Sequence, residues 1–219
     1  MKFLRKFNEH TSYEAEVNVG GDFKIPNVSY CKDVKDVHFN PYNLIKFYVG
    51  NITGTTPQTV SIYTDETNHI DVTVSKGNKW YSYLLPKNKG LYSITGKQQE
   101  FDDDIITKVI VKANISYYSN TDLTESAIIS NSTVEASFKG SDTSNVTSMD
   151  YMFYHCSRLT SLDLSGWDMR SVTNTSAMFR DCTSLRTIRI VGCTTETRTK
   201  IEEALTAAGI KDNVTIVTE

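Results

Sequence analysis

The chain has 219 residues, with 23 basic and 26 acidic side chains and a formal net charge of −3. Apolar residues make up 39% of the chain and charged residues 22%, a composition that is typical of a globular domain and excludes a disordered chain or a membrane-embedded protein. The slight acidity argues against general nucleic-acid binding, which requires a basic surface.

Residues 1–42 are interpreted as a short leader. Its basic start is followed by no apolar run, so it is not a secretory signal, and we expect the protein to be made and folded in a cytoplasm. Residues 17–25 predict a β-hairpin turned by two glycines, and Pro26 interrupts its pairing. Because a lone hairpin is marginally stable in water, we expect this one to pair with a partner or with the following domain.

Residues 43–119 predict a β-sandwich-like domain, either a sandwich or a small barrel. Segments rich in β-branched and aromatic residues recur about every ten residues, with turn residues between them. The predicted strands cover 44–49, 60–64, 70–74, 79–85, 91–94 and 106–111.

Four aromatic residues of this domain, Trp80, Tyr81, Tyr83 and Tyr92, are candidates for a sugar-binding platform. Aromatic residues also stabilise a sheet by cross-strand packing without any ligand, and this second interpretation is favoured. Tyr81 and Tyr83 share one face of the predicted strand and Trp80 points to the other, so at least one set is expected in the core.

An acidic run at residues 100–104 is the densest in the chain. Hard cations such as Ca²⁺ bind several carboxylates, but this run lacks the spaced ligands and the central glycine of a calcium loop. A solvated turn is therefore the favoured interpretation.

Residues 120–219 contain an internal repeat with a period of 26 residues. Residues 146–164 align with 172–190, and Val, Thr, Met, Phe, Cys and Leu recur at matching places. Extended outward, the period predicts four short strands with inward-facing pairs at 136 and 138, 162 and 164, 188 and 190, and 214 and 216.

The turn before each predicted strand has its own apolar column. Met152, Phe153 and Cys156 recur as Met178, Phe179 and Cys182, and then as Ala204, Leu205 and Ala208. The third version lies in residues 199–209, which predict an amphipathic helix ended by a glycine. A terminal repeat that departs in this way is typical of a cap.

Residues 145–165, Asn-Val-Thr-Ser-Met-Asp-Tyr-Met-Phe-Tyr-His-Cys-Ser-Arg-Leu-Thr-Ser-Leu-Asp-Leu-Ser, resemble the BspA-like leucine-rich repeat family, and the match extends over 134–219. The resemblance implies a strand-and-turn solenoid of the kind found on bacterial, protozoan and phage surface proteins, with a role in adhesion or display. Two departures are a Thr at position 175, where the family has Met, and an array of barely four repeats.

A second resemblance concerns the leader. Residues 1–9, 25–31 and 37–42 resemble the leader of structural proteins of Bacteroidales phages, including crAss-like phages. This resemblance implies attachment to a virion. The candidate docking residues are Phe23, Ile25, Pro26, Val28 and Tyr30.

The outward positions of the repeat strands form three predicted columns. They are Glu135, Ser161, Thr187 and Asn213; Ser137, Asp163, Arg189 and Thr215; and Lys139, Ser165, Val191 and Val217. Asp163 and Arg189 fall on adjacent strands and can pair, although an exposed pair contributes only about 0–1 kcal/mol. Tight binding sites are rich in Trp, Tyr and Arg, so this polar face predicts a weak, avidity-dependent contact or a solvated surface. The candidate exposed residues are Ser161, Asp163, Ser165, Thr187, Arg189, Val191 and Thr215.

The sequence predicts no catalytic, cofactor or metal site. The four cysteines form no Cys-x-x-Cys pair, which argues against zinc. His155 and Cys156 are adjacent, but neighbours in sequence point apart, and Cys156 falls in an apolar column typical of an inert thiol. Cys156 and Cys182 are expected on adjacent repeats, close enough for a disulfide, although reduced thiols are favoured in a cytoplasm.

These observations predict a mainly β protein with a hairpin leader, a β domain and a helix-capped repeat. The expected function is that of a non-enzymatic bacteriophage virion protein, a head-decoration or head-fibre protein that displays its repeat on the virion surface. Its expected partners are other capsid or tail proteins, a host surface glycan or protein, and further copies of itself, with no membrane insertion. The alternatives are a bacterial cell-surface adhesin and a glycan-binding module.

Overall fold

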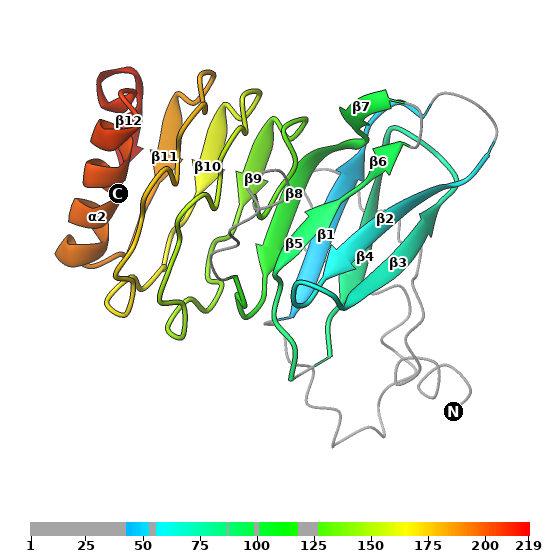
Figure 1. Cartoon of the computed structure of the whole chain (residues 1–219), viewed down its shortest axis with the longest axis horizontal. Helices are drawn as coiled ribbons and strands as arrows, with labels where there is room; N and C mark the ends of the chain where they lie inside the picture. The colour runs from blue at the N-terminus through cyan, green and yellow to red at the C-terminus, as the bar shows by residue number, and fades with distance from the viewer. Residues whose placement is uncertain (1–42, 53–55, 87, 99–100, 118–126) are drawn as a thin grey trace.

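The computed structural model describes residues 43–52, 56–86, 88–98, 101–117 and 127–219 (Figure 1). The predicted hairpin at 17–25 and the candidate docking residues Phe23, Ile25, Pro26, Val28 and Tyr30 lie outside the described residues. Within them the chain is mainly β, as predicted.

Seven strands form one sheet in the order β12-β11-β10-β9-β8-β1-β4 (Figure 1). Their bounds are β1 Leu44–Val49, β4 Lys79–Leu84, β8 Ile106–Lys112, β9 Glu135–Ser137, β10 Ser161–Asp163, β11 Thr187–Arg189 and β12 Thr215–Val217. Two smaller sheets have the orders β3-β2-β5 and β6-β7. Their strands are β2 Gln58–Tyr63, β3 His69–Val74, β5 Ser93–Thr95, β6 Lys97–Gln98 and β7 Phe101–Asp104.

The large sheet changes from antiparallel to parallel pairing at β8. β1 pairs antiparallel with β4 and β8, whereas β8 pairs parallel with β9. Side chains alternate across a strand, so one residue from each strand forms a continuous inward row. That row consists of Tyr81, Phe47, Val109, Ala136, Leu162, Ile188 and Ile216.

The 26-residue register is confirmed for β9, β10 and β11. Leu162 lies opposite Ala136 on one side and Ile188 on the other, each 26 positions away. The register predicted for the last strand is wrong, because Ile188 lies opposite Ile216 rather than Val214. The helix and 3₁₀ turn that precede β12 take up two more residues than the earlier turns, and this shifts the strand by two positions.

A glycine follows each of the first three repeat strands at the same place. Gly140, Gly166 and Gly192 have φ of 69°, 81° and 74° and are spaced by 26 residues. Residues other than glycine pay a steric cost in this left-handed region, and glycine does not. The chain therefore leaves each strand by the same turn, and this periodic signal was present in the sequence.

Each repeat, a strand with the turn before it, is called a rung here, and the rungs stack through their turns as well as their strands. The Phe153 and Phe179 rings are 5.7 Å apart and nearly parallel, and both side chains are fully buried. The backbone N–H groups of Tyr151 and Phe153 donate to the carbonyls of Ser176 and Met178 in the next rung. The apolar turn column predicted from Met152 to Leu205 is therefore in the core.

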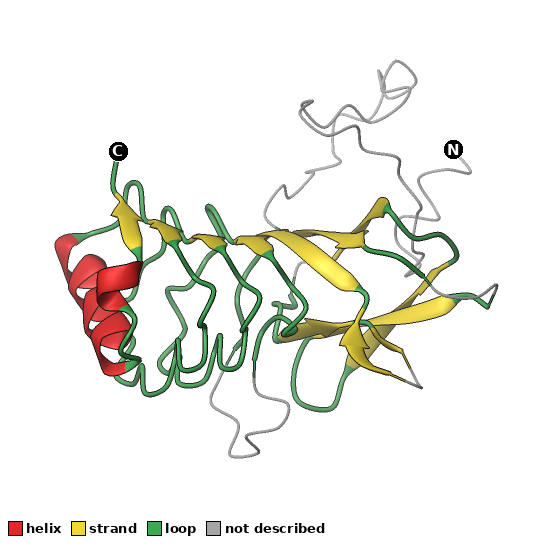
Figure 2. Cartoon of the chain, turned by 90° about the horizontal axis from the view of Figure 1, so that it is seen from above, coloured by secondary structure: helices red, strands yellow, loops and turns green. Residues whose placement is uncertain are grey.

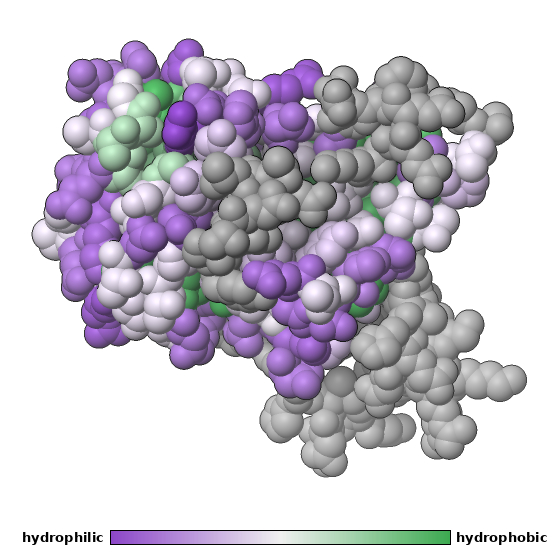
Figure 3. All heavy atoms as spheres, viewed as in Figure 1, coloured by the Kyte–Doolittle hydropathy of each residue, from purple (hydrophilic) through white to green (hydrophobic). Residues whose placement is uncertain are grey.

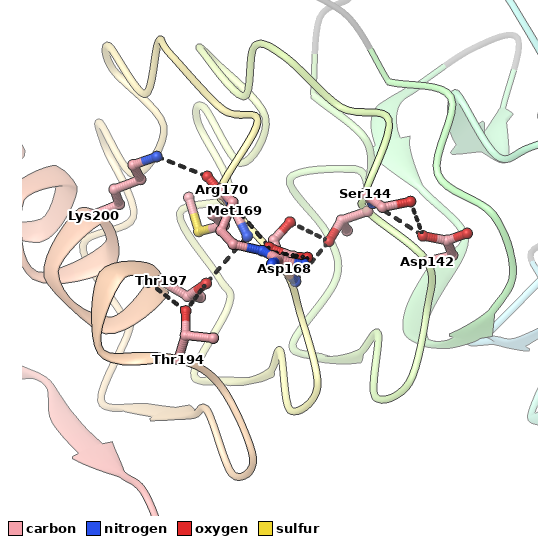
Figure 4. A network of polar contacts seen from close by, with 9 residues as sticks. Asp142, Ser144, Asp168, Met169, Arg170, Thr194, Thr197 and Lys200 are labelled. Atoms are coloured by element: carbon pink, nitrogen blue, oxygen red, sulfur yellow. Dashed lines mark hydrogen bonds and ion pairs between the residues drawn. The ribbon is translucent and has the colours of Figure 1, made fainter.

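Helix α2, Thr195–Ala207, covers the last rung, with Gly209 beyond its end as predicted. Figure 4 shows the contacts that fix it, which begin at the N-terminal cap residue Thr194, whose side chain accepts a hydrogen bond from Thr197 N–H. Asp142 and Asp168 occupy the same place in the two preceding rungs and accept hydrogen bonds from backbone N–H groups two residues later. The polar turn of each rung thus becomes a helix cap in the last one.

Lys200 of α2 is expected to be a main stabiliser of this cap. Its ammonium donates to the carbonyls of Met169 and Val172 at 2.8 and 2.9 Å, so Lys200→Met leaves both carbonyls without this donor. We expect a loss of about 1–3 kcal/mol of unfolding free energy, measured by chemical denaturation. Arg198→Met, which removes only the exposed pair with Glu202, should cost less than about 1 kcal/mol, and equal costs for the two variants would contradict this assignment.

The apolar side chains of the whole described chain form one buried cluster. It includes Phe47 and Ile62 of the first half and Phe138 and Leu205 of the second. The β domain therefore shares its core with the repeat, because β8 and β9 pair directly and carry the core across residue 119. The strands of the repeat continue the sheet that β1, β4 and β8 begin, and they do not form a separate sheet (Figure 2).

Candidate binding surface

The side chains between the inward positions of the large sheet point outward and form a single face, called here the outer face. One outer row consists of Trp80, Tyr48, Lys108, Glu135, Ser161, Thr187 and Thr215. The next consists of Ser82, Lys46, Ile110, Ser137, Asp163, Arg189 and Val217. Seven strands thus present a continuous surface along the length of the molecule.

The end of the outer face on β1, β4 and β8 is aromatic and basic. The Tyr48 and Trp80 rings meet edge to face with centroids 5.5 Å apart, and Ile110 is 42% exposed, the one large apolar side chain so exposed among the described residues. Partial burial lowers the pKa of Lys46 beside them. Tyr48 and Ile110 were not predicted as surface residues, although the alternation of 44–49 and 106–112 was a sufficient signal.

The end of the outer face on β9 to β12 is small and polar. Arg189 and Thr215 are exposed, and Ser161, Asp163, Thr187 and Val191 are partly buried. Ser165 is 4% exposed and its hydroxyl accepts a hydrogen bond from Val191 N–H, so it is not an exposed residue.

Two ion pairs cross adjacent strands of this face. Arg189 Nε lies 4.0 Å from Asp163 Oδ2, as the sequence predicted, and Lys108 Nζ lies 3.0 Å from Glu135 Oε2. Solvent reaches both pairs, although Asp163 is partly buried, so each contributes about 0–1 kcal/mol. Thr215 was predicted beside Arg189 and Val217 beside Val191, but they lie opposite Thr187 and Arg189, two residues earlier.

The aromatic platform predicted in the first half does not form as a set. Tyr81, Tyr83 and Tyr92 are 1%, 5% and 4% exposed and belong to the core. Tyr81 stacks on Phe47, and its hydroxyl donates to the carbonyl of Lys76. Trp80 alone of the four reaches the outer face, as the alternation predicted.

Asp104, at the end of the acidic run, is buried rather than part of a solvated turn. Its carboxylate accepts hydrogen bonds from Gly96 N–H, Ile106 N–H and the Thr95 hydroxyl at 2.7–3.0 Å. Burial raises the pKa of this carboxyl, and these hydrogen bonds oppose the rise. Thr95 belongs to β5 and Ile106 to β8, so the Asp104 carboxylate connects these two strands.

Among the described residues, the cysteines and histidines do not gather at one place. Cys156 is fully buried and its thiol donates to the carbonyl of Ile129, while the His155 side chain is 62% exposed and points to Asp181. Cys156 and Cys182 are free thiols, and burial raises both pKa values, that of Cys182 to about 12. Within the described ranges, no three His, Cys, Asp or Glu side chains are grouped so as to hold a metal ion.

Hydrophilic residues dominate the described surface in the view of Figure 3, with apolar residues confined to small areas. In the part of the chain that the structure describes, no helix is long and apolar enough to cross a membrane.

Comparison with known proteins supports one assignment. The model of a family described as "Mycoplasma protein of unknown function, DUF285" matches residues 99–215. No curated protein and no solved structure matches the chain significantly. The matched segment begins before β8 and ends at the first residue of β12, so it includes β8 to β11 in full.

Proposed function

The chain belongs to the DUF285 family, and on this premise we propose that residues 120–219 form a short BspA-like leucine-rich-repeat solenoid displayed on the surface of a bacteriophage virion. In this proposal the protein is a non-enzymatic head-decoration or head-fibre protein. Residues 43–119 form the sandwich-like base, and the leader docks on the particle.

The observation that carries the proposal is the continuous sheet. Because β8 pairs with β9, the repeat is held rigidly by the base rather than by a flexible linker. A rigid arm holds its outer face at a constant distance from the particle. Many copies on one particle then convert weak single contacts into useful avidity.

The docking part of the proposal predicts the behaviour of a chain that lacks residues 1–42. We expect this truncated protein to be folded and soluble but absent from purified particles, because β1 to β12 contain the shared core. Mass spectrometry of particles from cells that express the truncated or the full chain measures this. A full chain with Thr215→Ala, a change at an exposed outer position, should keep normal occupancy.

Normal occupancy of the truncated protein would refute the docking role of the leader. The position of the gene and the location of the protein distinguish a bacterial adhesin from a virion protein. A gene among cell-envelope genes, with the protein found on cells rather than particles, would favour a bacterial adhesin. Capsid or portal genes beside it favour the virion proposal.

A further inference from the structure

A second surface of the repeat lies on its turns, on the side of the molecule away from strands β9 to β12 (Figure 2). Its residues are Tyr151, Tyr154, His155, Arg180 and Asp181, called here the turn patch. The Tyr154 ring stands edge to face against Tyr151 at 5.5 Å and against His155 at 4.5 Å. Asp181 of the next rung lies beside them, 3.6 Å from His155 Nε2 and 3.9 Å from Arg180 Nε.

The backbone of the turn patch adopts a costly conformation. Tyr151, His155 and Asp181 have φ of 57°, 57° and 63°, in the left-handed region that bulky residues rarely occupy. Ala177, 26 positions after Tyr151, has φ of 51°, so the same backbone recurs in successive rungs. Here the inter-rung hydrogen bonds from Tyr151 and His155 N–H hold it.

The polar side chains of the turn patch contribute only two long ion pairs to the fold. The tyrosine hydroxyls and the Asp181 carboxylate make no hydrogen bond within the described residues, and the two contacts of Asp181 exceed ordinary hydrogen-bond lengths. The Arg180 and His155 side chains are 65% and 62% exposed. Aromatic faces thus stand next to a carboxylate and a guanidinium that can still accept and donate.

This combination matches the chemistry of one sugar ring. The apolar C–H face of a sugar packs on an aromatic ring, and its hydroxyls bond to charged groups that are held in place. The opposite charges of Arg180 and Asp181 balance, which favours a neutral ligand. A protein partner needs a standard interface of about 800 Å² on each side, much more than five side chains offer.

We propose that the turn patch binds a neutral glycan, with Tyr154 as the stacking residue and Asp181 and Arg180 as hydrogen-bonding residues. This inference rests on the proposed display function and names its ligand class. It places the ligand on the turns rather than on the outer face. Because the patch is open, single-site affinity is weak, with a dissociation constant of about 1 mM, and display in many copies compensates for it.

The test uses the full chain and an array of neutral glucose-, mannose- and galactose-containing oligosaccharides, followed by saturation-transfer NMR on the best binder. Tyr154→Ala should weaken binding by about tenfold or more, because it removes the stacking surface. Asp181→Asn should weaken it about fivefold, and this variant should keep the fold because Asn tolerates a positive φ. The matched control, Ser161→Ala on the outer face, should bind like the original chain.

Circular dichroism on each variant separates loss of binding from loss of fold. No neutral glycan bound at about 5 mM, or binding that survives both turn-patch variants, would overturn the inference. Binding lost in Ser161→Ala instead would move the site to the outer face and overturn it as well. Absence of the protein from particles would refute the display function and leave these binding results unchanged, so the two failures are distinguishable.

Discussion

Replacing Phe179 with alanine is expected to lower the free energy of unfolding of the full chain by about 3–5 kcal/mol. Phe179 is fully buried and stacks on Phe153, one rung away, at 5.7 Å. Stacked rungs hold one another only through their neighbours, so a cavity in the last turn weakens the helical cap and the rung before it. Chemical denaturation followed by circular dichroism measures the loss.

The control for this variant is Ser161→Ala, on the outward side of the neighbouring strand. The Ser161 hydroxyl makes no hydrogen bond within the described part of the chain, so the expected change is within about 0.5 kcal/mol. Ser165→Ala is unsuitable, since it removes the acceptor of Val191 N–H. Because the core is shared, we expect a single unfolding transition, and similar small effects of Phe179→Ala and Ser161→Ala would contradict the stacking of the rungs.

Replacing Asp104 with alanine is expected to lower the free energy of unfolding by about 2–5 kcal/mol, the second large effect after that of Phe179→Ala. The change leaves Gly96 N–H and Ile106 N–H without an acceptor in a buried place, and each orphaned group costs about 1–3 kcal/mol. Asp104→Asn keeps one side-chain oxygen and should cost less. Denaturation of the two variants side by side measures the difference, and a cost within about 0.5 kcal/mol for Asp104→Ala would show that water replaces the carboxylate.

Asp104 also predicts a dependence of stability on pH. Its pKa is raised by burial, so between the unfolded and folded pKa values the folded chain binds more protons than the unfolded chain. The contribution to stability is therefore fully present below the unfolded value, near 4, and is lost as pH rises through the folded value. Asp104→Asn should remove this loss of stability at rising pH. Identical profiles of unfolding free energy against pH for this variant and the original chain would contradict the prediction.

Local sequence patterns predicted the repeat well. The 26-residue period placed Phe153 on Phe179 and Leu162 beside Ile188, because each rung repeats the same backbone and the same inward positions. The alternation of residues 79–85 also separated Trp80 from the buried Tyr81 and Tyr83. In these cases a short pattern determines which side of a strand a residue faces.

Features that depend on contacts between distant segments were missed. The pairing of Lys108 with Glu135 extends the sheet by one strand, yet β8 carries none of the turn motif that marks the repeat. The two-residue shift at Thr215 arises from the length of the helical turn, which the period does not encode. The turn patch escaped notice because positive φ at Tyr151 and His155 has no signature in residue type.

An averaged electron-microscopy map of the particle tests the central claim most directly. The account predicts density for the chain at regular positions on the capsid, with the β1–β4 end of the sheet toward the shell and helix α2 at the outer tip. Difference maps from particles that lack the protein would identify this density. Particles without such density, or density with α2 against the shell, would contradict display of the repeat.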